Sequence, residues 1–68
     1  MKNDLVIKVK LKAEDINFFT KIFEGYDGLA VVTTIDGRAG LLQLTVTPQT
    51  KMDVLEILRN FPSEIIFQ

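Results

Sequence analysis

The polar residues best suited to chemistry lie in two short turns bracketed by glycines, EGYDG at 24–28 and DGRAG at 36–40. A carboxylate beside a tyrosine or an arginine can hold a cation or a small amine, and the two turns supply Glu24, Tyr26, Asp27, Asp36 and Arg38. The glycines also have a structural explanation, because Gly after a helix and Asp-Gly between strands are common turn chemistry. We therefore interpret both turns first as structure and second as a weak polar ligand site.

The side chains that carry most catalysis are absent from the sequence. It contains no histidine and no cysteine, which removes the commonest general base, the thiolate nucleophile and cysteine-ligated metals. Neither glycine turn matches GxxxxGK(S/T) or GxGxxG. Ser63, the threonines and the carboxylates form no recognisable catalytic pattern. We expect a protein that is not an enzyme and that uses no cofactor and no metal.

Length and charge narrow the possible functions further. With 47% hydrophobic and 25% charged residues, the chain should fold as one domain over residues 1–68. Folding at this size hides only about 60% of the unfolded surface, and without disulfides self-association is the remaining support. The net charge of -1 gives no broad positive field, which disfavours nucleic acid as a partner. No apolar run reaches the roughly 18 residues of a membrane span, and the start MKNDLVIKVKLK lacks a signal-peptide core, so we expect a cytoplasmic protein. Because the core is small, we expect this protein to be a homodimer.

The spacing of apolar residues predicts six elements in the order βαββαβ. Period-two alternation in LVIKVKLK indicates a first strand, whereas helical spacing follows from residue 13 to residue 24. We expect further strands over 29–35, 41–47 and 64–68, and a second helix that ends before Pro62. The second helix has two equally legible starts, a Thr47 cap with Pro48 in the first turn and a Thr50-x-x-Asp53 capping box.

The two halves of the chain match each other, which predicts the topology. Laying the chain on itself puts Ile7 on Leu42 and Phe19 on Val54. Two related βαβ units with right-handed crossovers give the ferredoxin-like fold, an α+β sandwich with an antiparallel sheet ordered 4-1-3-2. Both helices then cover one face of the sheet and leave the other face open to water or to a partner.

The length of the DGRAG loop decides which side chains of the strand 29–35 face the core. A five-residue loop places Ile35 opposite Leu41, whereas a four-residue loop inverts every side chain of the strand. Burial alone favours four residues, but the match between the two halves favours five. We choose five, which turns these residues toward the helices: Ala30, Val32 and Thr34.

This choice predicts an apolar patch on the open face of the sheet. An apolar patch on a folded domain marks an association surface. Phe18, at the margin of the first helix's apolar stripe, either widens the core face or protrudes as a further contact. The residues expected in the open-face patch are Leu29, Val31, Ile35 and Leu41.

The stretch EGYDGLAVVTTID, together with the whole βαββαβ plan, resembles a small uncharacterised bacterial family, a domain of unknown function. The resemblance implies a stand-alone ferredoxin-like domain without an assigned activity, so it gives no residue a role. The plan is also similar to the ACT regulatory modules, which bind amino acids where subunits meet. The first strand-to-helix loop, LKAED, lacks the glycine with which those modules admit a ligand's backbone.

Three functions are therefore compared. The leading hypothesis is a non-enzymatic binding or interaction module that self-associates through its open sheet face or an edge strand. The first alternative is an ACT-like amino-acid sensor with its ligand at a dimer interface. The second is an RNA-associated domain, supported by the lysines at 8, 10 and 12. RNA-binding domains of this fold stack bases on aromatic residues, and the corresponding positions here are Lys8, Lys10, Gln43 and Thr45.

Overall fold

A single antiparallel sheet of four strands forms one layer of the molecule. The computed structural model describes residues 5–26 and 28–68, and the strands in it run in the order β2-β3-β1-β4. The prediction of 4-1-3-2 is the same order counted from the other edge, and it is confirmed. The strands are β1 (Leu5–Lys10), β2 (Val31–Asp36), β3 (Leu41–Val46) and β4 (Ile66–Phe67).

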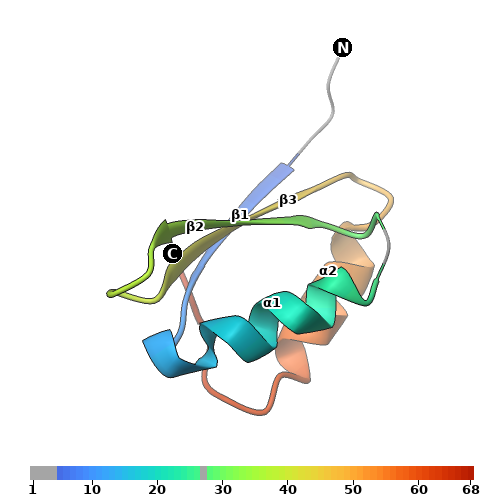
Figure 1. The fold of residues 1–68 in the computed structure, drawn as a ribbon. Coiled ribbons are helices and arrows are strands. Elements are labelled where there is room, and N and C mark those ends of the chain that lie inside the picture. The colour runs from blue at the N-terminus through green and yellow to red at the C-terminus, as the bar shows by residue number, and fades with distance from the viewer. Residues whose placement is uncertain (1–4, 27) are drawn as a thin grey trace.

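Two helices form the second layer on one side of this sheet (Figure 1). They are α1 (Ile16–Glu24), which follows a short 3₁₀ turn at Ala13–Asp15, and α2 (Lys51–Arg59). Figure 1 shows both helices below the strands, while the opposite face of the sheet carries no helix. The architecture is the α+β arrangement expected of a ferredoxin-like βαββαβ fold.

The core lies between the two layers and is apolar. Along β3, buried residues alternate with half-buried ones, as expected of a strand with one covered face. The ring of Phe19 packs against those of Phe23 and Phe61, with centroids 5.1 Å and 5.4 Å apart. Burial of a side chain of this kind contributes about 1.5–3 kcal/mol. The buried hydrophobic residues of the described chain are Val9, Leu11, Phe19, Phe23, Leu42, Leu44, Val46, Val54 and Leu58.

The start of α2 supports the first of the two predicted caps. The Thr47 hydroxyl accepts a hydrogen bond from the Thr50 N–H (3.3 Å), and the Thr50 hydroxyl accepts one from the Thr47 N–H (3.0 Å). The Lys51 N–H donates to the Thr47 carbonyl at 2.9 Å, so helical bonding begins at Thr47. This reciprocal pair has the geometry of a capping box, with Thr50 in the place usually taken by Glu. Thr47 therefore caps the turn over residues 48–50 that leads into α2, whereas Thr50, directly before Lys51, makes no side-chain capping bond to the helix.

In the β2–β3 hairpin, the side chains of β2 point to the predicted sides of the sheet, but the loop does not have the predicted length. Val32 pairs with Leu44, yet Asp36 and not Ile35 stands opposite Leu41, because the register shifts just before Asp36. A bulge at Ile35 adds one residue to β2 but none to β3. The loop over 37–40 has four residues, and with the bulge it turns the side chains of β2 to the same sides as a five-residue loop without a bulge. The prediction of the loop length was wrong for this reason. Ala30 and Val32 pack against the core as predicted, whereas Thr34, which pairs with Leu42 and so points to the same side, is exposed.

The hairpin is fixed against the end of β1 at Gly40. This glycine has a φ of 74°, and its carbonyl accepts a hydrogen bond from the Leu11 N–H at 2.9 Å. A Cβ at this position would overlap the Leu11 carbonyl oxygen. Both the positive φ and the close backbone approach require glycine. The tip of the hairpin is thereby held beside residues 11–13.

Candidate functional site

The polar residues of the two glycine turns do not form one site. The turn at 24–28 precedes β2 and the turn at 36–40 follows it, so the two lie at opposite ends of that strand. Glu24 and Tyr26 are exposed at the end of α1, while Asp36 and Arg38 are exposed in the hairpin. Asp27 lies outside the described residues. A single ligand cannot contact all of these side chains.

The carboxylate of Asp36 is used to hold the hairpin. Its Oδ1 accepts hydrogen bonds from the Arg38 N–H at 3.1 Å and from the Ala39 N–H at 3.2 Å. An Asp that satisfies the N–H groups two and three residues ahead is the usual Asx-turn arrangement. This geometry supports the structural interpretation of the DGRAG turn.

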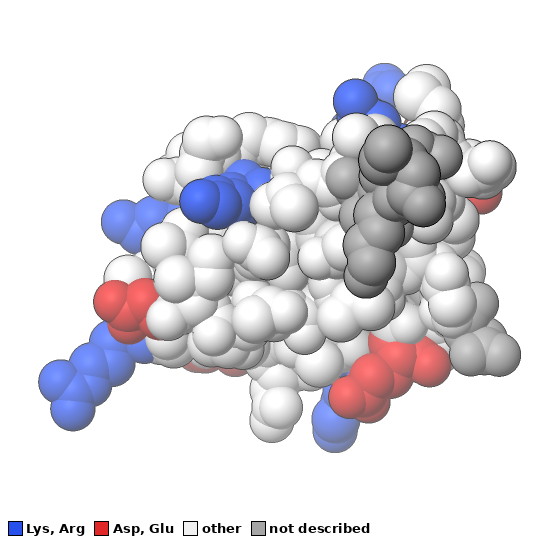
Figure 2. Space-filling model, turned by 90° about the horizontal axis from the view of Figure 1, so that it is seen from above, with Lys and Arg blue, Asp and Glu red and all other residues white. Residues whose placement is uncertain are grey.

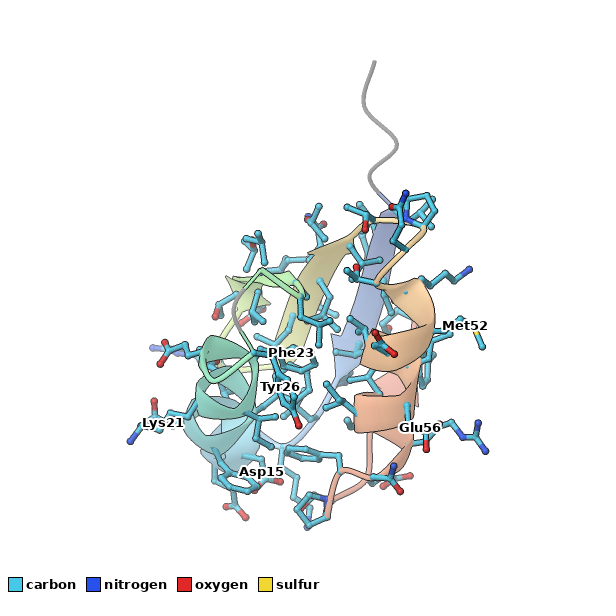
Figure 3. The ribbon with its side chains drawn as sticks, turned by 90° about the vertical axis from the view of Figure 1, so that its right-hand side faces the viewer. Asp15, Lys21, Phe23, Tyr26, Met52 and Glu56 are labelled. Carbon is cyan, nitrogen blue, oxygen red and sulfur yellow. The ribbon has the colours of Figure 1, made fainter. Side chains whose placement is uncertain are left out.

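Tyr26 lies beside a cleft between the two helices. Figure 3 shows its side chain between α1 and α2, and the cleft of about 440 Å³ is lined mainly by apolar residues. Two of its polar residues are already engaged, because the Asn60 amide donates to the Glu56 carbonyl at 2.9 Å and to its carboxylate at 3.2 Å, and the Tyr26 hydroxyl is the remaining polar group in the described lining. Glu56 also pairs with Arg59 at 3.9 Å. The cleft therefore lacks the convergent free polar groups that orient a small ligand.

The five apolar residues predicted as an interface occupy three different places. Val31 and Ile35 are exposed at 64% and 46% on β2, and half-buried Leu41 faces outward on β3. Leu29 precedes β2 and packs against the core, so its expected place on the open face was wrong. Phe18 is 52% exposed on α1, where its ring lies 5.7 Å from that of Phe61. Phe18 thus belongs to the helical layer and not to the open sheet face.

Two further apolar residues lie on the open face and were missed from the sequence. Val6 pairs with Thr45, and Ile66 pairs with Lys10, so both point away from the helices. Their exposures are 54% and 49%. Period-two alternation around Lys8 could have indicated Val6, whereas Ile66 needed the strand register. The open-face apolar patch, as used below, consists of Val6, Val31, Ile35, Leu41 and Ile66.

Charge is unevenly distributed over the open face. The lysines at 8 and 10 both lie on β1, whereas the outward residues of β3 and of β2 up to the bulge are uncharged. Figure 2 looks onto this side of the molecule and shows a largely uncharged middle, with several basic side chains toward the hairpin end at the left and others at the upper right and lower margins. Residues paired across neighbouring strands form three rows on the open face, and these rows are Val6–Thr45–Val31, Lys8–Gln43–Thr33 and Ile66–Lys10–Leu41.

A cavity of about 510 Å³ lies at the hairpin end of the sheet. Its charged lining is Lys10, Lys12, Arg38 and Glu64, and its apolar lining comes from Leu11, Ala13, Ala39 and Ile66. Sequence reasoning placed Arg38 beside Asp36 as part of an amine site. The structure instead places Arg38 with two lysines that lie far from it in the sequence, a grouping that no local pattern signals.

Neither a metal cluster nor a membrane span is present in the part of the chain that the structure describes. Within residues 5–26 and 28–68, no group of three Asp, Glu, His or Cys side chains could hold a metal ion. None of the helices there is long and apolar enough to cross a membrane.

Comparison with known proteins gives a family and no activity. No curated protein and no solved structure matches the chain. A family model described as a domain of unknown function (DUF4911) matches residues 9–65. The matched segment begins within β1 and ends next to β4, so it contains both helices and the β2–β3 hairpin. The chain therefore belongs to this family of domains of unknown function.

Proposed function

We propose that the chain is a non-enzymatic cytoplasmic interaction module that forms a homodimer through its open sheet face. The observation that carries the proposal is the open-face apolar patch, in which Val31 is 64% exposed and Val6 is 54% exposed. Exposed apolar side chains gathered on one face of a folded domain support association, although Thr45 lies between Val6 and Val31 and Lys10 lies between Ile66 and Leu41. Burying this patch against a partner removes apolar surface from water and thereby lowers the free energy.

The occupant best suited to this face is a second copy of the chain. Three strands of six residues and one of two residues, about 4.8 Å apart and rising about 3.3 Å per residue, cover about 320 Å² on each copy. Stable specific interfaces bury about 800 Å² per partner, and weak ones bury less. A face-to-face pair of copies should therefore be a weak dimer that forms at micromolar concentration.

The charges favour a contact on the β2–β3 half of the face. The lysines at 8 and 10 would repel the same residues of a second copy if β1 lay at the centre of the contact. The outward residues of β2 before the bulge and of β3 carry no charge. β2 is also an edge of the sheet, and from Val31 to Ile35 it has neither charge nor proline to protect that edge.

The test replaces an exposed valine on the open face by lysine. Val31→Lys should give a folded monomer at micromolar concentration in analytical ultracentrifugation, because a charge in an apolar contact is not compensated. The matched control is Met52→Lys, since Met52 is 72% exposed on the helical layer and points outward in Figure 3. Circular dichroism melts check that both variants fold.

The control should remain dimeric. A wild-type chain that stays monomeric at millimolar concentration would contradict the proposal. So would a Val31→Lys dimer as tight as that of the wild type.

The two alternative functions predict other results. An ACT-like sensor would show a thermal shift with one free amino acid and would bind that ligand where two copies meet. An RNA-associated domain would bind single strands with a steep dependence on salt. The outward positions of β1 and β3 carry Lys8, Lys10, Gln43 and Thr45, which offer no aromatic ring for a base to stack on.

A further inference from the structure

The cavity at the hairpin end brings basic groups together from three separate segments. Lys10 is the last residue of β1, Lys12 precedes the 3₁₀ turn, and Arg38 lies at the tip of the hairpin. All three line the same space of about 510 Å³, within the roughly 300–1,000 Å³ of small-molecule sites. Among the described residues of the lining, Glu64 supplies the one carboxylate. The cavity is therefore positively charged in a chain whose net charge is -1.

The backbone that carries these groups is held in place by hydrogen bonds. Gly40 accepts from the Leu11 N–H at 2.9 Å, which ties the hairpin to the end of β1. The Asp36 carboxylate fixes the Arg38 N–H at 3.1 Å, and the Lys12 carbonyl accepts from the Asp15 N–H at 2.9 Å. Groups on a braced backbone lose less conformational freedom when a ligand orders them.

The three cations of the cavity form no ion pair within 4.0 Å in the described part of the chain, although Glu64 lines the same space. Among residues 5–26 and 28–68, the one ion pair within 4.0 Å joins Glu56 and Arg59 on α2. Lys10, Lys12 and Arg38 thus have no acidic partner at that distance in the described chain. Three cations with one carboxylate nearby leave an excess of positive charge, and an anion bound among the cations lowers their mutual repulsion.

We propose that this cavity binds a small dianion with a short carbon skeleton, either a phosphate ester or a dicarboxylate. A guanidinium such as that of Arg38 matches the paired oxygens of phosphate and carboxylate, and the lysines add two point charges. Leu11 and Ile66 supply apolar walls for a carbon chain. The Glu64 carboxylate would repel a continuous phosphate backbone, and it can accept a hydrogen bond from a hydroxyl group of a ligand. A small ligand therefore fits the cavity better than RNA.

The experiment measures binding by isothermal titration calorimetry at low ionic strength, with glycerol 3-phosphate and succinate as the two dianion probes and acetate as the monoanion. One of the dianions should bind, and acetate should bind at least about tenfold more weakly, a difference of about 1.4 kcal/mol. The stronger of the two probes identifies the phosphate or the carboxylate source.

Arg38→Gln and Lys12→Gln should each weaken the binding of that dianion about tenfold, which again is about 1.4 kcal/mol. The matched control is Arg59→Gln, which removes the same charge from an exposed position on α2 and should leave the affinity within about twofold. Both cavity residues are exposed, and circular dichroism confirms that each variant folds.

Three results would overturn the proposal. The first is that neither dianion binds. The second is an equal loss in Arg59→Gln and Arg38→Gln, which would indicate general charge screening. The third is that single-stranded RNA binds more tightly than either dianion and that this binding is lost in Arg38→Gln and Lys12→Gln, which would assign the cavity to a nucleic acid. Because the assay needs no dimer, failure of this proposal and failure of the dimer are separate results.

Discussion

Val31 and Val32 are adjacent residues of the same type on β2, yet they have opposite roles. Val32 is partly buried against the core opposite Leu44, whereas Val31 is 64% exposed opposite Thr45. Their difference comes from strand parity and not from side-chain chemistry. The comparison teaches that, on this edge strand, hydrophobicity alone does not tell which face is the core. The hairpin and its bulge decide it.

The first prediction concerns the two faces of β3 and has the largest effect. Leu44→Ala should lower the free energy of unfolding by about 2–5 kcal/mol, because a fully buried side chain leaves a cavity. Gln43→Ala, one residue away on the open face, should change it by about 0.5 kcal/mol or less. Urea denaturation followed by circular dichroism measures both. Similar losses in the two variants would show that the open face is covered in the folded state.

The second prediction concerns the glycine that fixes the hairpin. Gly40→Ala should destabilise the protein by more than about 1 kcal/mol, because the new Cβ meets the Leu11 carbonyl at a positive φ. Gly28 has the same φ of 74° but nothing within 4 Å of its Cβ position. Gly28→Ala therefore reports the cost of the conformation alone, and its loss in thermal denaturation should be the smaller one. Equal losses would mean that the hairpin is not closed on β1.

Much of the fold could be predicted from the sequence because its signals are local or repeated. Alternation along β1 and β3 and helical spacing in α1 reflect directly which side of each element is covered. The match between the two halves then gave the strand order. The bulge at Ile35 could not be predicted in this way, because it is a property of the pairing between two strands.

The site was less predictable than the fold, and the reason is long-range contact. Leu29 reads as part of a strand, but β2 begins at Val31 and the turn before it directs Leu29 into the core. Arg38 and Lys12 line the same cavity because Gly40 brings the hairpin against residues 11–13. Which residues become neighbours at the end of a sheet depends on how the loops close, and the periodicity of the sequence carries no information about loop closure.

The third prediction has the smallest effect and concerns the loop that follows the bulge. Asp36→Ala should lower the free energy of unfolding by about 1 kcal/mol or less, since the lost acceptor serves two N–H groups that water can reach. Asp36→Asn keeps an oxygen acceptor at the same place and should retain most of the stability. Chemical denaturation compares the two variants with the wild type. A loss well above 1 kcal/mol in Asp36→Ala, with rescue by Asn, would show that the Asx turn also holds the bulge, and through it the parity that separates Val31 from Val32.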